Sequence, residues 1–234
     1  MLTQTAIRAA SAPPTYFAAP QVDRNANDRP PRDLLATILH LMGAVVSYRR
    51  NTELFGENEP ADYLYKVVSG SVRTYKILSD GRRQVCGFYL PGDCFGLQLS
   101  EAHTFSAEAI NDTKVLVVKR SALTALADRD AAVGRELFAL TARELRRMQE
   151  QVLLLVKSAQ ERVASFLVEM SDRAAAGNAI ELPMSRQDIA DYLGLTIETV
   201  SRTLTSLEGC AAIELPTSRC IVLRNRSALN RMNG

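Results

Sequence analysis

The sequence has few cysteines, no tryptophan and no long hydrophobic run. Its four cysteines form no CxxC pair and its two histidines make no metal-binding group with them, so we predict no metal site. No stretch approaches the roughly 18 consecutive apolar residues of a membrane-spanning helix, and the amino terminus lacks the apolar segment of a secretory signal. We therefore expect a cytoplasmic protein without membrane contact, whose thiols are reduced and buried. The residues concerned are Cys86, Cys94, Cys210, Cys220, His40 and His103.

An excess of one charge sign is also absent. Lysine and arginine number 28 against 26 aspartate and glutamate, and the net charge of +2 identifies no partner. Basic residues do gather near the carboxyl end, where the segment from Arg202 onward has five arginines and two glutamates. Such a cluster can neutralise phosphates. A solvated charged tail explains it equally well.

The composition is that of a globular protein, with 47% hydrophobic and 23% charged residues. Residues 1–31 are rich in proline, alanine and asparagine and are expected to form a flexible arm, followed by a short helix over 32–43. From Ser47 to Lys119, brief β-rich runs are separated by glycines, and Asp80-Gly81 is typical of a hairpin turn. Short antiparallel strands at this density favour a barrel or jelly roll.

A long helix is predicted over about residues 128–157. Apolar residues recur there at alternating spacings of three and four, which forms a heptad seam with one polar member. We expect a second copy of the chain to pack on this seam. The alternative is a helix that lies on its own domain, because Leu137, Leu140, Leu153 and Leu154 widen the stripe. The seam residues are Phe138, Thr141, Leu145, Met148, Val152 and Leu155.

The last sixty residues carry the most informative pattern. After a second helix over about 159–176, Ser185 is a good N-cap, and Asp188 three residues later completes a capping box. Gly194 permits a sharp turn, Thr196 caps the next helix and Gly209 ends it. Two short helices joined by a glycine turn are typical of a helix-turn-helix.

The second of these helices divides into an apolar and a polar face. Ile197, Val200, Leu204 and Leu207 are expected to bury together. Glu198, Ser201 and Arg202 lie opposite and suit base edges in DNA, since arginine pairs with guanine and glutamate accepts from the cytosine amine. An ordinary i,i+4 ion pair between Glu198 and Arg202 is the simpler alternative.

A hairpin follows, with Ala212–Leu215 and Cys220–Leu223 as its strands, and it is a plausible wing. Around these elements we expect contacts to DNA phosphates from hydroxyl and guanidinium groups. The predicted phosphate-binding residues are Ser185, Arg186, Thr196, Thr199, Thr205, Arg219 and Arg224.

After residue 31 the chain resembles the CRP/FNR superfamily of bacterial transcription regulators and is most similar to its FNR–FixK branch. The Glu-x-x-Ser-Arg trio at Glu198, Ser201 and Arg202 is quite specific to this branch. The other segments that carry the resemblance are 65–75, 80–85, 88–96, 159–167 and 192–202.

The resemblance implies an α+β fold with an antiparallel β-roll, a jelly roll like those that bind cyclic nucleotides, then a long dimerisation helix and a winged helix-turn-helix. The implied parts are an arm over 1–31, a β-roll over 32–127, a dimer helix over 128–157 and a DNA-binding domain over 158–234. The implied function is a homodimeric activator that binds double-stranded DNA at palindromes similar to TTGA-n-TCAA and recruits RNA polymerase. Regulation of nitrogen fixation, or responses to oxygen and redox state, is implied by the FixK-type likeness.

The departures from the family pattern concern the effector. Members that bind cyclic AMP carry a Gly-Glu pair and an arginine, whereas Leu97 follows Gly96 here and 95–104 has no arginine. The arm has none of the cysteines that hold an iron–sulfur cluster in FNR. We therefore expect no cofactor and no small-molecule effector.

Two alternative functions are compatible with the same fold class. One is a regulator of the same architecture that is gated by haem or a small metabolite, which the absorbance of the purified protein would reveal. The other is a cupin-like enzyme, which would need a metal triad or a nucleophile–base pair that His103 alone does not supply. We therefore expect a protein that is not an enzyme.

Position 185 is also a candidate for redox control. At a helix start beside Arg186, a cysteine would have a lowered pKa and would oxidise readily, whereas serine keeps the cap without that chemistry. We expect DNA binding to resist mild peroxide and Ser185→Cys to make it sensitive. Of the four cysteines, Cys210 lies just past the second helix and Cys220 lies in the hairpin, so these two are the candidates for exposure.

Overall fold

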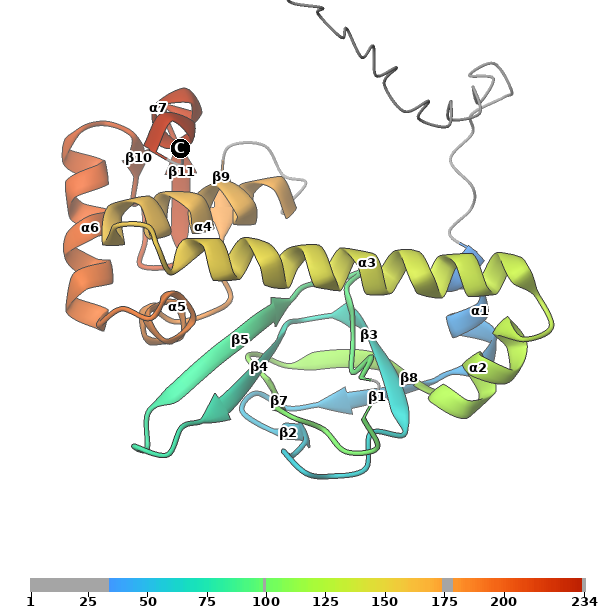
Figure 1. Ribbon diagram of the computed structural model, residues 1–234. Coiled ribbons are helices and arrows are strands. Elements are labelled where there is room, and N and C mark those ends of the chain that lie inside the picture. Colours follow the sequence, from blue (N-terminus) through green and yellow to red (C-terminus); the bar gives the residue numbers. More distant parts are fainter. Residues whose placement is uncertain (1–33, 99, 174–178, 233–234) are drawn as a thin grey trace, which may run out of the picture. The chain divides into compact units, whose positions relative to one another are not determined.

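The computed structural model describes residues 34–98, 100–173 and 179–232. These residues belong to one compact unit, in which a β-rich part is followed by a long helix and a mainly helical part (Figure 1). No helix within the described ranges is long and apolar enough to cross a bilayer.

The β-rich part is the predicted β-roll. Its described strands form two four-stranded sheets with the orders β1-β8-β3-β6 and β2-β7-β4-β5, and neighbouring strands pair antiparallel. The strands are β1 (Ala44–Tyr48), β2 (Glu53–Phe55), β3 (Tyr63–Ser69), β4 (Val72–Ile77), β5 (Arg83–Tyr89), β6 (Cys94–Phe95), β7 (Ser106–Ala109) and β8 (Thr113–Lys119).

Strands β4 and β5 form the hairpin expected from Asp80-Gly81. Gly81 has φ +84°, a left-handed conformation that glycine adopts without a steric penalty. The backbone amide of Leu78 donates to the carbonyl oxygen of Arg82 at 2.8 Å, and the amide of Arg82 donates to the Asp80 carboxylate at 3.0 Å. These bonds close the tip of the hairpin.

Aromatic side chains occupy the space between the two sheets. The ring of Phe55 lies 5.2 Å from that of Tyr65 and 6.2 Å from that of Phe95, measured between centroids. The imidazole of His103 stacks on Phe55 at 3.6 Å. Because these rings are buried, the interior of the β-roll is a packed core.

One continuous helix, α3 (Ala131–Leu154), accounts for most of the region predicted as 128–157. It begins where the Asp130 carboxylate accepts from the amide of Ala132, an N-cap. Leu137 and Leu140 pack on the β-roll together with helix α1 (Leu34–Met42) and helix α2 (Arg120–Ala127). Helix α2 was not predicted from the sequence.

The carboxyl-terminal part contains the predicted helix pair. Helix α4 (Ala159–Arg173) precedes α5 (Arg186–Leu193) and α6 (Ile197–Gly209). The predicted end of α4 at residue 176, and the stop signal Gly177-Asn178, lie outside the described residues.

The predicted hairpin is present as β10 (Ile213–Glu214) and β11 (Cys220–Leu223). A third strand, β9 (Ala179–Glu181), pairs with β11 on its other side, and helix α7 (Arg226–Met232) follows. Neither β9 nor α7 was predicted, because three- and seven-residue elements carry little periodicity.

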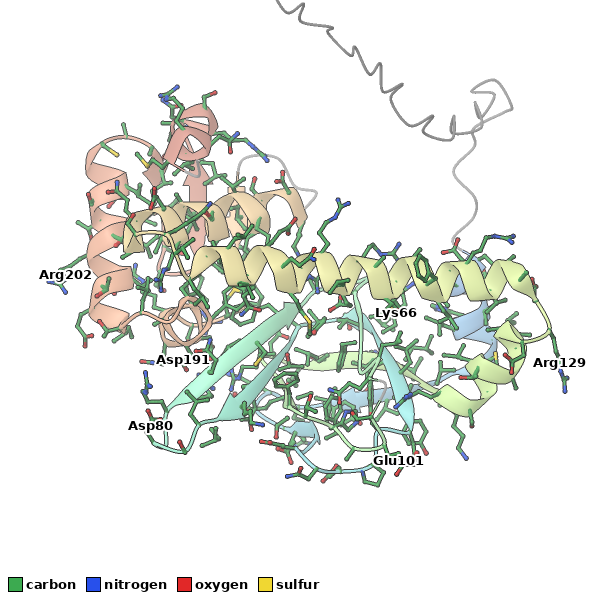
Figure 2. All side chains as sticks on the ribbon, in the orientation of Figure 1. Lys66, Asp80, Glu101, Arg129, Asp191 and Arg202 are labelled. Carbon is green, nitrogen blue, oxygen red and sulfur yellow. The ribbon has the colours of Figure 1, made fainter. Side chains whose placement is uncertain are left out.

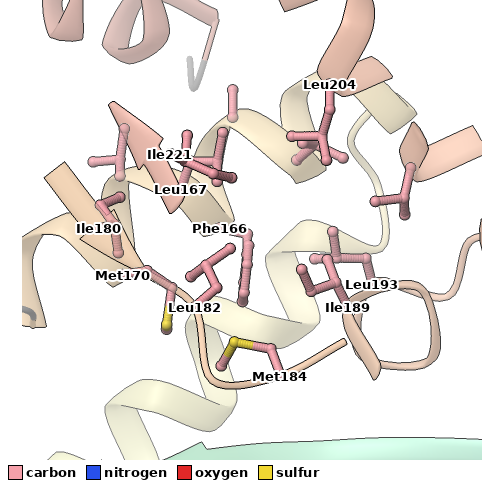
Figure 3. Close-up of a cluster of buried hydrophobic side chains, with 14 of the residues drawn as sticks. Phe166, Leu167, Met170, Ile180, Leu182, Met184, Ile189, Leu193, Leu204 and Ile221 are labelled. Atoms are coloured by element: carbon pink, nitrogen blue, oxygen red, sulfur yellow. The ribbon is translucent and has the colours of Figure 1, made fainter. Parts of the chain in front are cut away.

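The helices and the small sheet enclose a hydrophobic core (Figure 3). Phe166 and Leu167 of α4 meet Leu193 of α5 and Leu204 of α6 in this cluster. The same cluster also contains Val85, Phe88 and Ile110 of the β-roll. The core thus continues from one part into the other, and the domain boundaries at 31/32, 127/128 and 157/158 stay a prediction.

Candidate nucleic-acid interface

The start of α5 is held by a complete capping box. The hydroxyl of Ser185 accepts from the amide of Asp188 at 3.1 Å, and the Asp188 carboxylate accepts from the amide of Ser185 at 3.0 Å. The hydroxyl also donates to the Asp188 carboxylate at 2.7 Å. The local pattern of the sequence was therefore sufficient to predict where this helix begins.

The turn between α5 and α6 depends on Gly194, whose φ is +63°. An arginine of α4, Arg162, donates to the carbonyl oxygen of Leu193 at 2.9 Å and so stabilises the end of α5. Thr196 then caps α6, because its hydroxyl accepts from the amide of Thr199 at 3.2 Å. Helix, turn and helix follow each other as predicted.

The buried face of α6 differs from the prediction at one position. Val200, Leu204 and Leu207 are buried, but Ile197 is 36% exposed. The prediction that Ile197 belongs to the buried stripe is therefore wrong. Ile197 is the first residue of α6, so its side chain lies at the edge of the surface that packs on α5.

The opposite face of α6 carries the predicted base-reading residues. Glu198, Arg202 and Thr205 are exposed and Ser201 is half-buried. Figure 2 shows Arg202 extending from α6 away from the rest of the chain. Thr205 donates to the carbonyl oxygen of Ser201 at 3.1 Å, a bond along the helix that leaves the exposed side of the threonine free to approach a partner.

Glu198 and Arg202 do not form the ion pair that was the simpler alternative. Among the ion pairs of the described ranges none joins these two residues, and Arg202 Nε instead donates to the backbone oxygen of Glu198 at 3.4 Å. Hydrogen bonds from the Glu198 amide and the Thr196 hydroxyl lower the pKa of the Glu198 carboxyl. The carboxylate is thus an ionised acceptor at the start of the exposed face.

The predicted phosphate-binding residues differ in whether their side chains have partners within the chain. Arg219 is exposed in the turn between β10 and β11. Thr199 shares a hydrogen bond with Thr196 near the start of α6, and three others are also bonded within the chain. Ser185 bonds Asp188, Arg186 donates to the Ser201 hydroxyl at 3.4 Å, and Arg224 pairs with Glu214.

The surroundings of Ser185 also bear on the redox expectation. A cysteine thiol in place of the hydroxyl would face the Asp188 carboxylate, which disfavours a thiolate. The expected peroxide sensitivity of Ser185→Cys stays a prediction. Cys94 is buried, Cys86 and Cys220 are half-buried and Cys210 is exposed. The expected exposure is confirmed for Cys210, and the general expectation of buried thiols holds fully only for Cys94. Cys210 follows the last residue of α6.

The predicted seam on α3 is exposed along its whole length. The exposed fractions of its large apolar side chains are 75% for Phe138, 56% for Leu145, 54% for Met148, 63% for Val152 and 62% for Leu155. Thr141 is exposed as well, and its hydroxyl donates to the carbonyl oxygen of Leu137 at 3.0 Å. A contiguous apolar row of this kind is typical of an interaction surface.

Residues that could hold a metal are not grouped in the described part of the chain. No cluster of three or more histidine, cysteine, aspartate or glutamate side chains has a suitable arrangement there. The two histidines lie apart, His40 exposed on α1 and His103 buried in the β-roll.

Two family models match the chain. A Crp-like helix-turn-helix domain covers residues 161–232, and a cyclic nucleotide-binding domain covers residues 45–130. The nitrogen fixation regulation protein FixK of Azorhizobium caulinodans is 50% identical over 204 residues, which are 85% of this chain and 82% of that protein. The chain belongs to the CRP/FNR family of transcription regulators.

A further relative and a solved structure also support this family assignment. The transcriptional activatory protein AadR of Rhodopseudomonas palustris is 44% identical over 168 residues, 70% of each chain. The solved structure of FixK2 from Bradyrhizobium japonicum has a TM-score of 0.80 and 52% identity, and the match covers 82% of this chain and 98% of that one. The predicted family, the β-roll with its winged helix-turn-helix and the FixK-type likeness are confirmed, and DNA binding is the property that the helix-turn-helix carries.

Proposed function

We propose that this CRP/FNR family member is a dimeric, sequence-specific transcription activator that acts without a small-molecule effector. The observation that carries the proposal is the exposed polar face of α6. Glu198, Ser201 and Arg202 lie on it, while Val200, Leu204 and Leu207 anchor the helix in the core. A recognition helix must be held in this way if its side chains are to read base edges in the major groove.

The seam on α3 supports a dimer. Two recognition helices must lie about 34 Å apart to enter successive major grooves, and a symmetric pair of chains supplies such a spacing. The homodimer would bind a palindrome similar to TTGA-n-TCAA and recruit RNA polymerase from there. Activation, as opposed to repression, is supported by relatives that are named transcriptional activators.

The packed interior of the β-roll supports the absence of an effector. Phe55, Tyr65 and Phe95 occupy the space between the sheets, and His103, from the segment that lacks the cyclic nucleotide-binding arginine, stacks on Phe55. A ligand would have to displace stacked rings. The alternative is a regulator of the same architecture that is gated by haem or by a small metabolite. An absorption band of haem in the purified protein would establish the haem-gated form.

The test is a DNA-binding measurement on Arg202→Ala. We expect a loss of about 1 to 3 kcal/mol on a palindrome that contains the guanine and little change on a scrambled site, because a bidentate contact to guanine is lost. The control is Arg219→Ala, which should weaken both sites alike and reduce the salt slope by about one unit. Equal losses on both sites for Arg202→Ala would assign Arg202 to a phosphate and contradict base reading.

A further inference from the structure

The β4–β5 hairpin is hydrogen-bonded to the first helix of the helix-turn-helix. Arg83 Nε donates to an Asp191 carboxylate oxygen at 2.8 Å, and Arg83 Nη2 donates to Asp188 at 2.6 Å. The adjacent Gln84 side chain donates to the backbone oxygen of Asp191 at 2.7 Å. Three directional contacts from two consecutive residues of β5 therefore hold α5.

A second arginine reaches the same helix from β4. Arg73 is buried and lies between two carboxylates, with Nη2 2.7 Å from Glu108 and Nη1 3.2 Å from Asp188. Asp188 is itself buried, and it closes the capping box with Ser185. One carboxylate thus joins the start of α5 to two arginines that lie more than 100 residues earlier in the sequence.

Apolar packing accompanies this network. Phe88 of β5 lies 5.2 Å from the ring of Tyr192 in α5 and 6.2 Å from that of Phe166 in α4. Apolar contact supplies attraction but little direction, so it would permit α5 to slide or rotate on the sheet. The hydrogen-bonded ion pairs allow one register, because a shifted helix would leave buried charges without partners.

The orientation of α5 determines that of α6. The two helices share the core through Leu193 and Val200, and Arg186 of α5 donates to the Ser201 hydroxyl on the reading face. A rotation of α5 relative to the β-roll would therefore move Ser201 and its neighbours on α6 as a unit.

We infer that Arg73 and Arg83 are positioning residues that fix the recognition helix on the β-roll in its DNA-binding orientation without a ligand. The inference rests on the proposed function, since it assumes that two recognition helices bind one palindrome. Arg73 and Arg83 lie on β4 and β5 and not on the exposed face of α6, so we expect them to add little to the contact of one recognition helix with one half-site. The network matters when both half-sites must be engaged at once.

The experiment compares a palindrome with an isolated half-site, at low salt so that the weaker complex is measurable. Full-length Arg83→Asp and Asp191→Arg should each lose at least tenfold in affinity for the palindrome and keep their half-site affinity within about threefold. The double variant should recover to within about threefold, because Arg at 191 can neutralise Asp at 83 and also lies one helical turn from Asp188.

The matched control is Arg82→Ala. Arg82 is the neighbouring arginine, its side chain is 78% exposed and it pairs with Asp80 of its own turn. It should bind both DNAs like the wild type. A loss with Arg82→Ala as large as that with Arg83→Asp would mean that the hairpin acts through its charge alone and would overturn the inference.

The remaining outcomes separate this inference from the proposed function. Palindrome binding unchanged in both single variants would overturn the positioning role. Equal losses on palindrome and half-site would also overturn it, because the variants would then act on the contact of each single helix-turn-helix with DNA. A wild-type protein that binds the palindrome no better than a scrambled sequence would contradict the proposed function itself.

Discussion

His103 is a buried imidazole whose environment favours its neutral form. Its exposed fraction is 1%, its ring stacks on Phe55, and neither ring nitrogen has a hydrogen-bond partner among the described residues. Burial lowers the pKa of His103 below its usual value of 6.5. Protonation would place an unpaired charge within an aromatic core.

The stability of the β-roll should therefore depend on pH through this residue. A histidine with a lowered folded-state pKa costs no stability above the unfolded value of about 6.5, where both states are neutral. As the pH falls below 6.5, the unfolded chain binds a proton that the folded chain does not, so the free energy of unfolding falls by up to about 1.4 kcal/mol per pH unit.

Denaturant unfolding at pH 7.5 and pH 5.5 measures this loss. His103→Leu, which fills the same space without a titrating group, should lose less stability than the wild type between the two pH values. His40→Gln, which changes the exposed histidine, should behave like the wild type. Equal pH dependence of the wild type and His103→Leu would contradict the assignment.

Residues with purely local roles were predictable from the sequence. Ser185, Gly194 and Thr196 act on backbone groups within a few positions of themselves, so their spacing alone identifies caps and turn. The capping role of Asp188 was predictable in the same way, but its pairing with Arg73 and Arg83 was not. Ile197 was placed wrongly because periodicity gives the direction of a side chain but not how far the neighbouring surface extends.

At the scale of elements, α3 has two apolar sides, one packed within the chain and one exposed. Leu137 and Leu140 pack on the β-roll, while the row from Phe138 to Leu155 is exposed. The two interpretations of the widened stripe, a seam for a second copy and a helix lying on its own domain, are compatible. They describe different sides of one helix.

From the exposed apolar row of α3 we predict a dimer. Charged side chains placed in this row should dissociate it. Leu145→Glu with Val152→Glu should raise the dimer dissociation constant at least 100-fold, because burial of such side chains contributes about 1.5 to 3 kcal/mol each and every tenfold change is about 1.4 kcal/mol. Sedimentation equilibrium measures this. Gln149→Glu adds charge to the same helix beside the seam and should leave the dimer intact. An unchanged dimer in the double variant would exclude this interface.

Elements that depend on distant pairing were less predictable. The β4–β5 hairpin has a short loop and a clear turn, so it was found from the sequence. Strand β9 pairs with β11 across about forty intervening residues, and its three residues gain their conformation from that pairing.

At the scale of the whole molecule, the described parts are joined by a shared core and by charges. Phe88 contributes to the core of the helical part, and Arg73 and Arg83 reach Asp188 and Asp191 of α5. This connection could not be predicted from the sequence, because the partners are more than 100 residues apart and each resembles an ordinary surface charge in its local sequence. The sequence therefore predicted the two parts better than their connection.

If the β-roll holds the two recognition helices rigidly, affinity for DNA should depend strongly on the spacing of the half-sites. Each base pair adds about 3.4 Å and a full turn takes about 10.5 base pairs, so inserting five base pairs between the half-sites turns one of them to the opposite side of the DNA. We expect palindrome affinity to fall to that of an isolated half-site. Inserting ten base pairs restores the face but separates the half-sites by a further 34 Å or so, and a dimer with fixed recognition helices should still not recover.

Binding curves on the three spacings measure this rigidity. A protein whose helix-turn-helix units were loosely tethered would recover much of its affinity at ten inserted base pairs, because a flexible connection can span the extra turn. Recovery in the wild type would therefore contradict a fixed arrangement of the recognition helices. Recovery only in Arg83→Asp would show that the ion pairs of Arg83 supply the rigidity, because that variant keeps the recognition helix and loses these ion pairs between β5 and α5.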